Sequence, residues 1–222
     1  MLKTENWEIV GWEASVRGMR NPKNSWEKSD SKFVAFDNLH IPILGSNDLK
    51  LMTTLRNAGT DHRKFMRMIT VYLDITAPLY WWKEFDTYKV GTVANSCSTM
   101  HKIADKEFTL EDFSHEHLFK DDETQTNTDV LEFVIDALNF ARDDYLKTKD
   151  KKYWWQMIQL LPSSYNQRRT IMLNYEVLAN IYKSRKNHKL DEWHTFCETI
   201  EKLPYSFLIT GVDNGATTEA EG

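Results

Sequence analysis

Hydrophobic and polar residues alternate with a short period in the first part of the chain and with a helical period in the second. Residues 6–16 alternate with a period near two, which is typical of a strand. Residues 69–78 are β-branched and aromatic, so they predict a second strand that ends at Pro78. Residues 17–32 are rich in Arg, Lys, Asn and Ser, which indicates a long polar loop that either is solvated or meets a phosphate.

Apolar residues at helical spacing predict several helices, most of them after residue 128. The first begins at a cap formed by Ser46 or Asn47 and stops before Gly59. A short helical or turn segment follows at 61–68, and longer helices are predicted at 79–86, 129–147 with Thr128 as the cap, 150–161, 167–186 and 191–202.

The remaining segments predict a site and a tail. Residues 87–101 are small and polar, so we expect them to line a site rather than to pack as a long helix. A chain of 222 residues buries a core of useful size without a disulfide or a metal, so we expect one domain over residues 1–210. Residues 211–222 are expected to be a disordered tail.

Composition narrows the class of protein. With 28 Lys and Arg against 33 Asp and Glu, the formal net charge is −5, which argues against a nucleic-acid binder. No apolar run reaches the roughly 18 residues that cross a bilayer, and the first residues lack the apolar stretch of a signal peptide. Cys97 and Cys197 show no metal-ligand spacing, which favours a reducing compartment. We therefore expect a cytoplasmic protein without membrane contact.

Common catalytic motifs are missing from the sequence, and two local clusters carry little chemistry. His115-Glu116-His117 has a spacing that places the imidazoles on opposite sides of a helix, so we expect a solvated acidic face and no metal site. Cys97 is a candidate nucleophile, which requires a base that lowers its thiol pKa. No such base is identified beside it, and the alternative is a buried or bystander thiol.

Asn174 and Arg185 interrupt an otherwise apolar pattern. Eleven residues separate them, close to three helical turns, so they share one face about 16 Å apart. A buried Asn must satisfy its donors and acceptor, and an Arg on the same face is able to fork onto a phosphate. Alternatively, Asn174 caps a neighbouring loop and Arg185 is a solvated charge that the helix dipole favours. Periodicity alone leaves both interpretations open.

Two stretches resemble the flavin-dependent thymidylate synthases. The first is TAPLYWWKEFDTYKVGTVANSCST, in which Ala77-Pro78 and Asn95 to Ser98 match the family after one inserted residue. The second is LPSSYNQRRTIMLNYEVLANIYKSRKNH, which matches without a gap from Leu161-Pro162 to Arg185. The resemblance covers residues 60–200.

The resemblance implies a fold, a reaction and a set of site residues. The fold would be α+β, with a mixed or antiparallel sheet flanked by long helices, in a homotetramer. The reaction would be flavin-dependent methylation of a pyrimidine nucleotide, deoxyuridine monophosphate (dUMP), with FAD as cofactor and NADPH and methylenetetrahydrofolate as co-substrates. By position, the residues that contact flavin would be Asn174, Asn180, Lys89 and Asn95, and those that contact the nucleotide would be Arg185, Ser98 and Glu84, with Ser98 and Arg185 at the reaction.

Several positions depart from the family pattern. Where the family carries Arg-His-Arg-x-x-Ser, this chain reads Tyr88 to Val93, and Lys89 is the one cation that remains. The acidic residue after the family's Asn is Ser96, its last Arg is replaced around Met100, and a helical Arg that contacts flavin is Glu176. Replacement cations are sought among Lys83, Arg63, Arg67, Arg17 and Arg20.

The departures leave two rival functions open. One is an enzyme of the same fold that modifies another nucleotide, for which the altered segment 87–101 is the reason. The other is a noncatalytic nucleotide-binding protein that has lost the flavin clamp.

Overall fold

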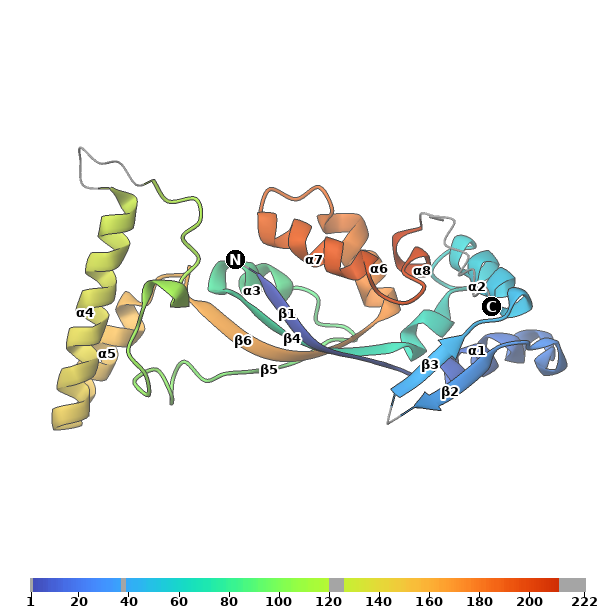
Figure 1. Cartoon of the computed structure of the whole chain (residues 1–222), viewed down its shortest axis with the longest axis horizontal. Helices are drawn as coiled ribbons and strands as arrows, with labels where there is room; N and C mark the ends of the chain where they lie inside the picture. Colours follow the sequence, from blue (N-terminus) through green and yellow to red (C-terminus); the bar gives the residue numbers. More distant parts are fainter. Residues whose placement is uncertain (1, 37–38, 120–125, 212–222) are drawn as a thin grey trace. The chain divides into compact units, whose positions relative to one another are not determined.

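The computed structural model describes residues 2–36, 39–119 and 126–211 (Figure 1). Its strands are β1 (Lys3–Val10), β2 (Lys32–Phe36), β3 (Leu39–Ile43), β4 (Thr70–Pro78), β5 (Val93–Ser96) and β6 (Asn166–Asn174). Its α-helices are α1 (Trp12–Arg20), α2 (Ser46–Asn57), α3 (Leu79–Phe85), α4 (Asn127–Thr148), α5 (Lys151–Leu160), α6 (Tyr175–Arg185), α7 (Asp191–Glu201) and α8 (Phe207–Thr210). Short 3₁₀ turns are η1 (Asn21–Lys23), η2 (Trp26–Lys28), η3 (Lys64–Met68) and η4 (Leu110–Asp112).

The strands form two sheets. One is four-stranded in the order β1-β4-β6-β5, and the other is the antiparallel pair β2 and β3, in which Lys32 lies opposite Ile43. In β4 every second side chain is buried, as Val71, Leu73 and Ile75 illustrate, because successive side chains point to opposite faces of a sheet. The predicted α+β class is confirmed.

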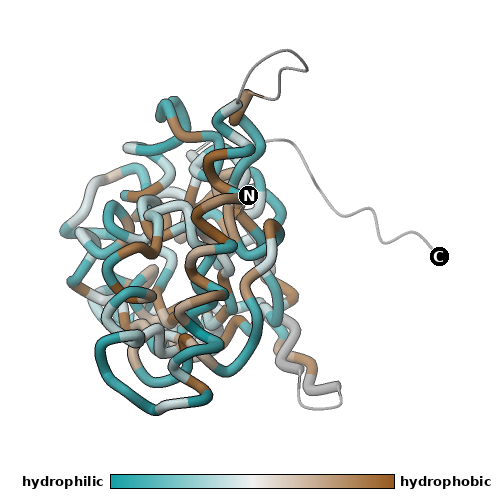
Figure 2. The backbone as a smooth tube through the Cα atoms, turned by 90° about the vertical axis from the view of Figure 1, so that its left-hand side faces the viewer, coloured by the Kyte–Doolittle hydropathy of each residue, from teal (hydrophilic) through white to brown (hydrophobic). Residues whose placement is uncertain are grey.

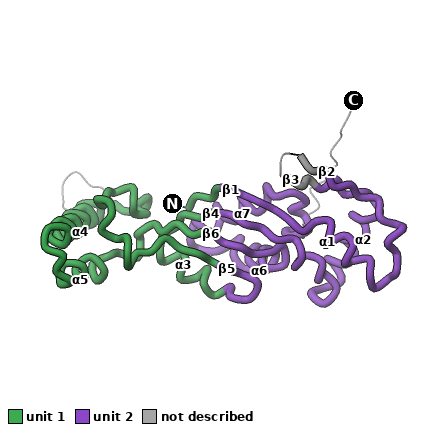
Figure 3. Tube along the Cα trace, turned by 90° about the horizontal axis from the view of Figure 1, so that it is seen from below, with its two compact units in different colours: residues 1–5, 74–87, 94–170 green, residues 6–73, 88–93, 171–222 purple. Residues whose placement is uncertain are grey.

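The chain divides into two compact units, coloured separately in Figure 3. All four strands of the larger sheet contribute residues to both units, and each unit is described by itself below. The single domain expected over residues 1–210 stays a prediction. Unit 1 comprises 1–5, 74–87 and 94–170, and unit 2 comprises 6–73, 88–93 and 171–222.

In unit 1, helices α4 and α5 pack through one apolar stripe. Leu131, Ile135 and Leu138 recur at helical spacing on α4 and are buried with Met157 of α5. Helix α4 begins at Thr126, whose hydroxyl and backbone N–H pair reciprocally with the third residue of the helix. On α3 a second cluster stacks the buried rings of two tryptophans and a phenylalanine, Trp81, Trp82 and Phe85.

In unit 2, aromatic side chains form the centre of the core. The ring of Trp12 meets the rings of Tyr175 and Tyr205 edge to face, at centroid distances of 5.2 and 5.4 Å. Trp12 follows Gly11, which adopts φ of 91° and lies so close to the carbonyl of Met68 that a Cβ would approach that oxygen to 2.0 Å. Only glycine fits between β1 and α1 at this approach.

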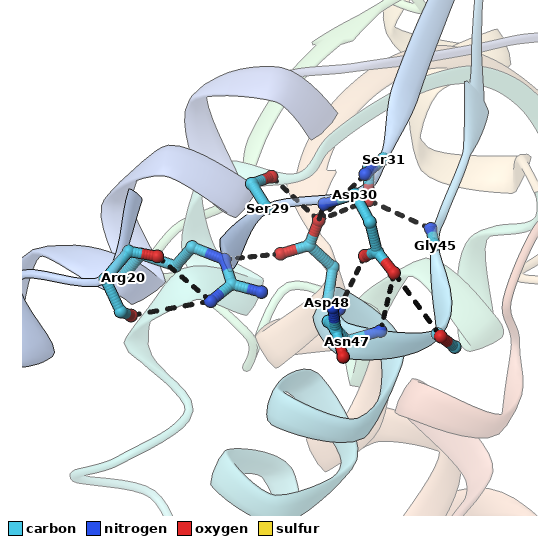
Figure 4. Close-up of polar contacts among 9 residues, drawn as sticks. Arg20, Ser29, Asp30, Ser31, Gly45, Asn47 and Asp48 are labelled. Carbon is cyan, nitrogen blue, oxygen red and sulfur yellow. Dashed lines mark hydrogen bonds and ion pairs between the residues drawn. The ribbon is translucent and has the colours of Figure 1, made fainter. Parts of the chain in front are cut away.

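A buried ion pair holds the first polar segment of unit 2 to α2 (Figure 4). Arg20 Nε donates to Asp48 Oδ1 at 2.6 Å, and both side chains are almost completely buried. The second Asp48 oxygen accepts four hydrogen bonds, from the hydroxyl groups of Ser29 and Ser31 and from the backbone N–H groups of Asp30 and Ser31. Burial acts to raise the pKa of Asp48, but these hydrogen bonds outweigh it and lower the pKa.

Most predicted elements are confirmed, including the strand that ends at Pro78, the turn at 61–68 and the helices at 79–86, 150–161 and 191–202. The caps differ. The first N–H groups of α2 donate to the carboxylate of Asp30 rather than to Ser46 or Asn47, and α4 begins at Thr126 rather than at Thr128. A helix is capped by whichever oxygen reaches its free N–H groups. For α2 that oxygen belongs to Asp30, which is distant in sequence.

Three predicted elements are wrong in part. The strand expected over 6–16 ends at Val10, because Gly11 turns the chain into α1. The loop expected over 17–32 holds the end of α1 and the turns η1 and η2. The helix expected over 167–186 is β6 up to Asn174, because its buried side chains there alternate, as Gln167, Ile171 and Leu173 show. The predicted tail lies, apart from Gly211, outside the described residues.

In the part of the chain that Figure 2 colours, hydrophilic residues repeatedly interrupt the hydrophobic ones. Within the described ranges, no helix is both long and apolar enough to cross a membrane.

We predict that Asp48→Asn destabilises the protein by about 3 kcal/mol, because the substitution leaves the buried guanidinium of Arg20 without its counter-charge. Denaturation in urea, followed by circular dichroism, measures this loss. The matched control is Asp61→Asn at an exposed position, which should change the free energy of unfolding by less than about 0.5 kcal/mol. Equal stability of both variants would contradict the role of the ion pair.

The same carboxylate predicts a pH dependence. Because the pKa of Asp48 is lower in the folded protein than its ordinary value of 3.8, its contribution to stability is complete above that value. The contribution is lost as the pH falls through the lowered pKa. Unfolding measured between pH 5 and pH 2, as approximate limits, should therefore show a steeper loss of stability in the wild type than in Asp48→Asn.

Candidate functional site

In unit 2, the junction of β6 and α6 is fixed by Asn174. Its side-chain Oδ1 accepts from the backbone N–H of Val177 at 3.0 Å, so Asn174 is the N-cap of α6. The next backbone N–H, of Tyr175, donates to the carbonyl of Ile69 at 3.1 Å. Asn174 therefore caps its own helix. The expectation that it shares a helical face with Arg185 is wrong, because β6 extends to Asn174, and the alternative that it caps a neighbouring loop is wrong as well.

Residues 88–92 form a short loop that lies along α6 and contacts both of its ends. At the N-terminal end, Gly91 has φ of 76°, and a Cβ on it would come within 3.1 Å of the Asn174 amide nitrogen and 3.2 Å of Val177. At the C-terminal end, the hydroxyl of Tyr88 accepts from Arg185 Nε at 2.8 Å. The loop places the exposed Lys89 between these two contacts.

Arg185 is held by aromatic rings. Its guanidinium carbon lies 4.7 Å from the centre of the Trp193 ring and 5.6 Å from that of Tyr88, so it makes cation–π contacts to both. Its position in the last turn of α6 is also favoured by the helix dipole. The side chain is half-buried, and these contacts fix its direction.

The N-terminal half of α6 carries a second cation that comes from η3. Arg63 Nε lies 2.8 Å from a carboxylate oxygen of Glu176, and Arg63 Nη2 donates to Asn180 Oδ1 at 3.4 Å. Five cations were considered as replacements for those missing from the altered loop. Of these, Arg63 contacts Asn180, a residue of its own unit that was predicted to contact flavin. Its charge is balanced by the buried Glu176.

The other replacement cations differ in their surroundings. Arg20 is buried against Asp48, so its candidacy as a replacement cation is wrong. Arg17, Arg67 and Lys83 are exposed.

In unit 1, a pocket of about 640 Å³ is lined by residues of β1, β4 and β6 and of the segment that follows β5. Cys97, Ser98 and Thr99 line it, which agrees with the expectation that the small polar segment lines a site. Basic side chains on its wall are Lys3, Lys102, Lys106 and Arg168, and acidic ones are Glu111, Asp112 and Glu116. The pocket therefore offers many donors together with balanced charge.

Hydrogen bonds to β6 fix the Cys97 side of this pocket. Cys97 N donates to the carbonyl of Arg168 at 2.9 Å, and Gln167 Nε2 donates to the Cys97 carbonyl at 2.8 Å. Gln167 Oε1 accepts from Arg169 Nε at 2.9 Å, so both ends of this buried amide are engaged. The backbone on either side of Ser98 is consequently held in place.

Ser98 closes a tight turn at the pocket wall. Its hydroxyl oxygen accepts from the backbone N–H of His101 at 3.0 Å, which leaves its O–H to donate. Tyr165 faces the same pocket, and its burial, with the nearby Asp112 and Cys97, raises the pKa of its phenol. The phenol therefore stays protonated near neutral pH and is a further donor.

The predicted site residues fall into two groups. Asn174, Asn180, Lys89 and Arg185 belong to unit 2 and are gathered by α6 and the loop 88–92. Ser98, Asn95 and Glu84 belong to unit 1. Of these three, Ser98 lines the pocket, Asn95 is exposed on β5, and Glu84 lies half-buried on α3.

Sequence reasoning missed several polar residues of both groups. Tyr88 and Trp193 hold Arg185 from segments distant in sequence, and no spacing signals such contacts. Lys102 and Lys106 line the pocket from a segment without regular structure, where periodicity carries no information. His115, which was considered only as part of a His-Glu-His cluster, lines the pocket from the same segment, and the helix assumed for residues 115–117 is wrong. In the part of the chain that the structure describes, no group of three or more His, Cys, Asp and Glu residues is arranged to hold a metal ion.

Comparison of structures identifies the fold. Two crystal structures of the flavin-dependent thymidylate synthase ThyX from Helicobacter pylori, each with FAD and dUMP, are similar to this chain, with a TM-score of 0.66 and 16% sequence identity. In both cases the similarity covers 95% of this chain and 98% of that chain. No protein-family model and no curated protein matches the sequence. The chain therefore has the fold of a flavin-dependent thymidylate synthase, and the resemblance is confirmed at the level of fold.

We predict that Asn174→Ala destabilises the protein by about 1 kcal/mol, because α6 loses its N-cap. Asn174→Asp is the matched variant, since Asp caps a helix about as well as Asn. Chemical denaturation of both variants checks the prediction. A loss of stability in Asn174→Asp as large as that in Asn174→Ala would contradict the capping role.

Proposed function

We propose that the protein transfers a methylene group reductively to a pyrimidine deoxynucleotide, converting dUMP to deoxythymidine monophosphate or catalysing a closely related reaction with FAD. The observation that carries this proposal is the similarity to ThyX structures with FAD and dUMP over nearly the whole of both chains. The Ser98 pocket and the ordered Arg185 support it, since both offer donors to a nucleotide.

The residues at α6 offer a flavin uncharged hydrogen-bond donors and one ammonium. Asn180 is exposed, and because its Oδ1 accepts from Arg63, its amide N–H groups point away from that contact. Lys89 supplies an exposed ammonium beside them. Uncharged donors such as the Asn180 amide suit the carbonyl and hydroxyl groups of a flavin. One ammonium, that of Lys89, suits a single contact to phosphate. We infer that the flavin diphosphate is held by Lys89 and by few other cations.

A bound flavin would supply hydride transfer, so this chain would need no nucleophile of its own. In the proposed reaction Asn174, Asn180, Lys89 and Asn95 hold the cofactor, and Ser98, Glu84 and Arg185 hold the nucleotide. Ser98 donates through its O–H, and Arg185 offers a guanidinium that Tyr88 and Trp193 already orient. Their contribution is alignment, which lowers the entropic part of the barrier.

The proposals for the reductant, the methylene donor, the oligomeric state and the compartment rest on the resemblance to the flavin-dependent thymidylate synthases and on the composition of the chain. NADPH is proposed as the reductant and methylenetetrahydrofolate as the donor of the methylene group. The active form is proposed to be a homotetramer in the cytoplasm.

A second candidate function is noncatalytic binding of a pyrimidine nucleotide. The loop 88–92 favours it, because Lys89 is the one cation of that loop and Val90, beside it, is 91% exposed. The balanced pair of Arg63 and Glu176 adds no net positive charge for a diphosphate. In this case the nucleotide site persists while the flavin site is lost.

The absorption spectrum of the purified protein, recorded before and after incubation with FAD and desalting, separates the two candidates. Retained bands of oxidised flavin, together with tritium release from dUMP labelled at carbon 5, support the enzyme. A colourless protein that binds dUMP supports the noncatalytic protein and contradicts the proposed reaction.

We predict that Arg185→Ala weakens dUMP binding at least about tenfold, which is about 1.4 kcal/mol, because the oriented guanidinium is lost. Isothermal titration calorimetry measures the affinity. Lys186→Ala is the matched control, since Lys186 is exposed at the next position. Unchanged affinity in a folded Arg185→Ala variant would show that Arg185 does not bind the nucleotide.

A further inference from the structure

The Ser98 pocket is rich in hydrogen-bond donors, and most of its side-chain acceptors are already engaged. The carboxylate of Asp112 pairs with Lys106 and accepts from the backbone N–H of Thr109. The oxygen of the Gln167 amide accepts from Arg169, and that of Asn166 accepts from the hydroxyl of Ser114. A ligand that presents an N–H to this pocket therefore needs a different acceptor.

His115 is that acceptor, because its tautomer is fixed. Its Nδ1 lies 2.8 Å from the carbonyl oxygen of Phe113. A carbonyl oxygen only accepts, so Nδ1 must carry the proton, and in the neutral ring Nε2 is left with a lone pair. Among the described residues, no side chain or backbone group is seen to donate to Nε2.

The segment that carries His115 is anchored to β6. Phe113 pairs with Tyr165 in an isolated antiparallel bridge, and Ser114 N donates to the carbonyl of Ser164 at 2.8 Å. The ring of Phe113 is 1% exposed. The imidazole is therefore presented to the pocket from a fixed backbone, as a specific contact requires.

His115 differs in charge from the carboxylates that also line the pocket. Glu111 and Glu116 are exposed anions, and they repel the phosphate of a nucleotide at close range. In its neutral form the imidazole carries no such penalty. The hydroxyl groups of Thr76, Ser98, Thr99 and Tyr165 are also neutral acceptors on the pocket wall, but they donate as well, whereas Nε2 in this tautomer only accepts.

We propose that His115 selects the base of the nucleotide, with its Nε2 accepting a hydrogen bond from the N3–H of a uracil ring. This inference rests on the proposed function, which supplies the pyrimidine nucleotide. Cytosine has a lone pair at N3, so it would face the lone pair of Nε2 and leave two acceptors opposed. The pocket therefore prefers dUMP to deoxycytidine monophosphate (dCMP).

The test is calorimetric titration of the full-length protein with dUMP and with dCMP. The wild type should bind dUMP at least about tenfold more tightly than dCMP. In His115→Ala the affinity for dUMP should fall and the preference should approach one. In His115→Gln the amide is able to turn either its oxygen or its nitrogen to the base, so the affinity should return without the preference.

His62→Ala, at an exposed position in unit 2, is the matched control and should retain the preference of the wild type. An unchanged preference in His115→Ala would overturn the inference and leave the proposed function standing. Equal losses of affinity for both nucleotides, unrestored in His115→Gln, would also overturn it, since they indicate a structural role. If the wild type binds neither nucleotide, the proposed function fails as well.

Discussion

The satisfaction of backbone N–H groups where β6 becomes α6 is the constraint on which the rest of unit 2 depends. Asn174 accepts from the N–H of Val177, and the N–H of Tyr175 donates to the carbonyl of Ile69, the residue before β4. These two hydrogen bonds fix where the helix begins, and a helix of given start has every later side chain set in direction. The positions of Glu176, Asn180 and Arg185 thus follow from one cap.

Around this helix, the charged side chains form ion pairs or lie on aromatic rings, so positive charge does not accumulate. Glu176 opposes Arg63, and Arg185 lies on aromatic rings with Tyr88 as its hydrogen-bond partner. A tyrosine stands in the loop where the family pattern has an arginine, so that position orients a cation instead of supplying one. The surroundings of α6 therefore carry less net positive charge, and a ligand proposed to bind there would be held more by the direction of hydrogen bonds than by Coulombic attraction.

The sequence predicts the elements whose signals are local. The strand at 69–78 and the helices of unit 1 were predictable because period and proline carry the information within one segment. The strand over 166–174 was not, because Ile171 also fits the helical spacing of Leu178 and Ile181. Asn174 was predictable as a residue of interest, but its role depends on the strand before it. The contacts of Asp48 with residues 20–31 join segments distant in sequence, and no pattern encodes them.

The two groups of site residues differ in what a substitution could preserve. At α6 the side chains of Asn180 and Arg185, which are proposed to bind ligands, also bond to Arg63 and Tyr88, so structure and the proposed binding are coupled there. In the Ser98 pocket the structural bonds are made by Gln167 and Ser114, while the hydroxyl proton of Ser98 and the Nε2 of His115 are left for a ligand. Binding in the pocket is therefore able to change by single substitutions without loss of fold. If the proposed function holds, the choice of nucleotide is therefore easier to change on this fold than the proposed cofactor site.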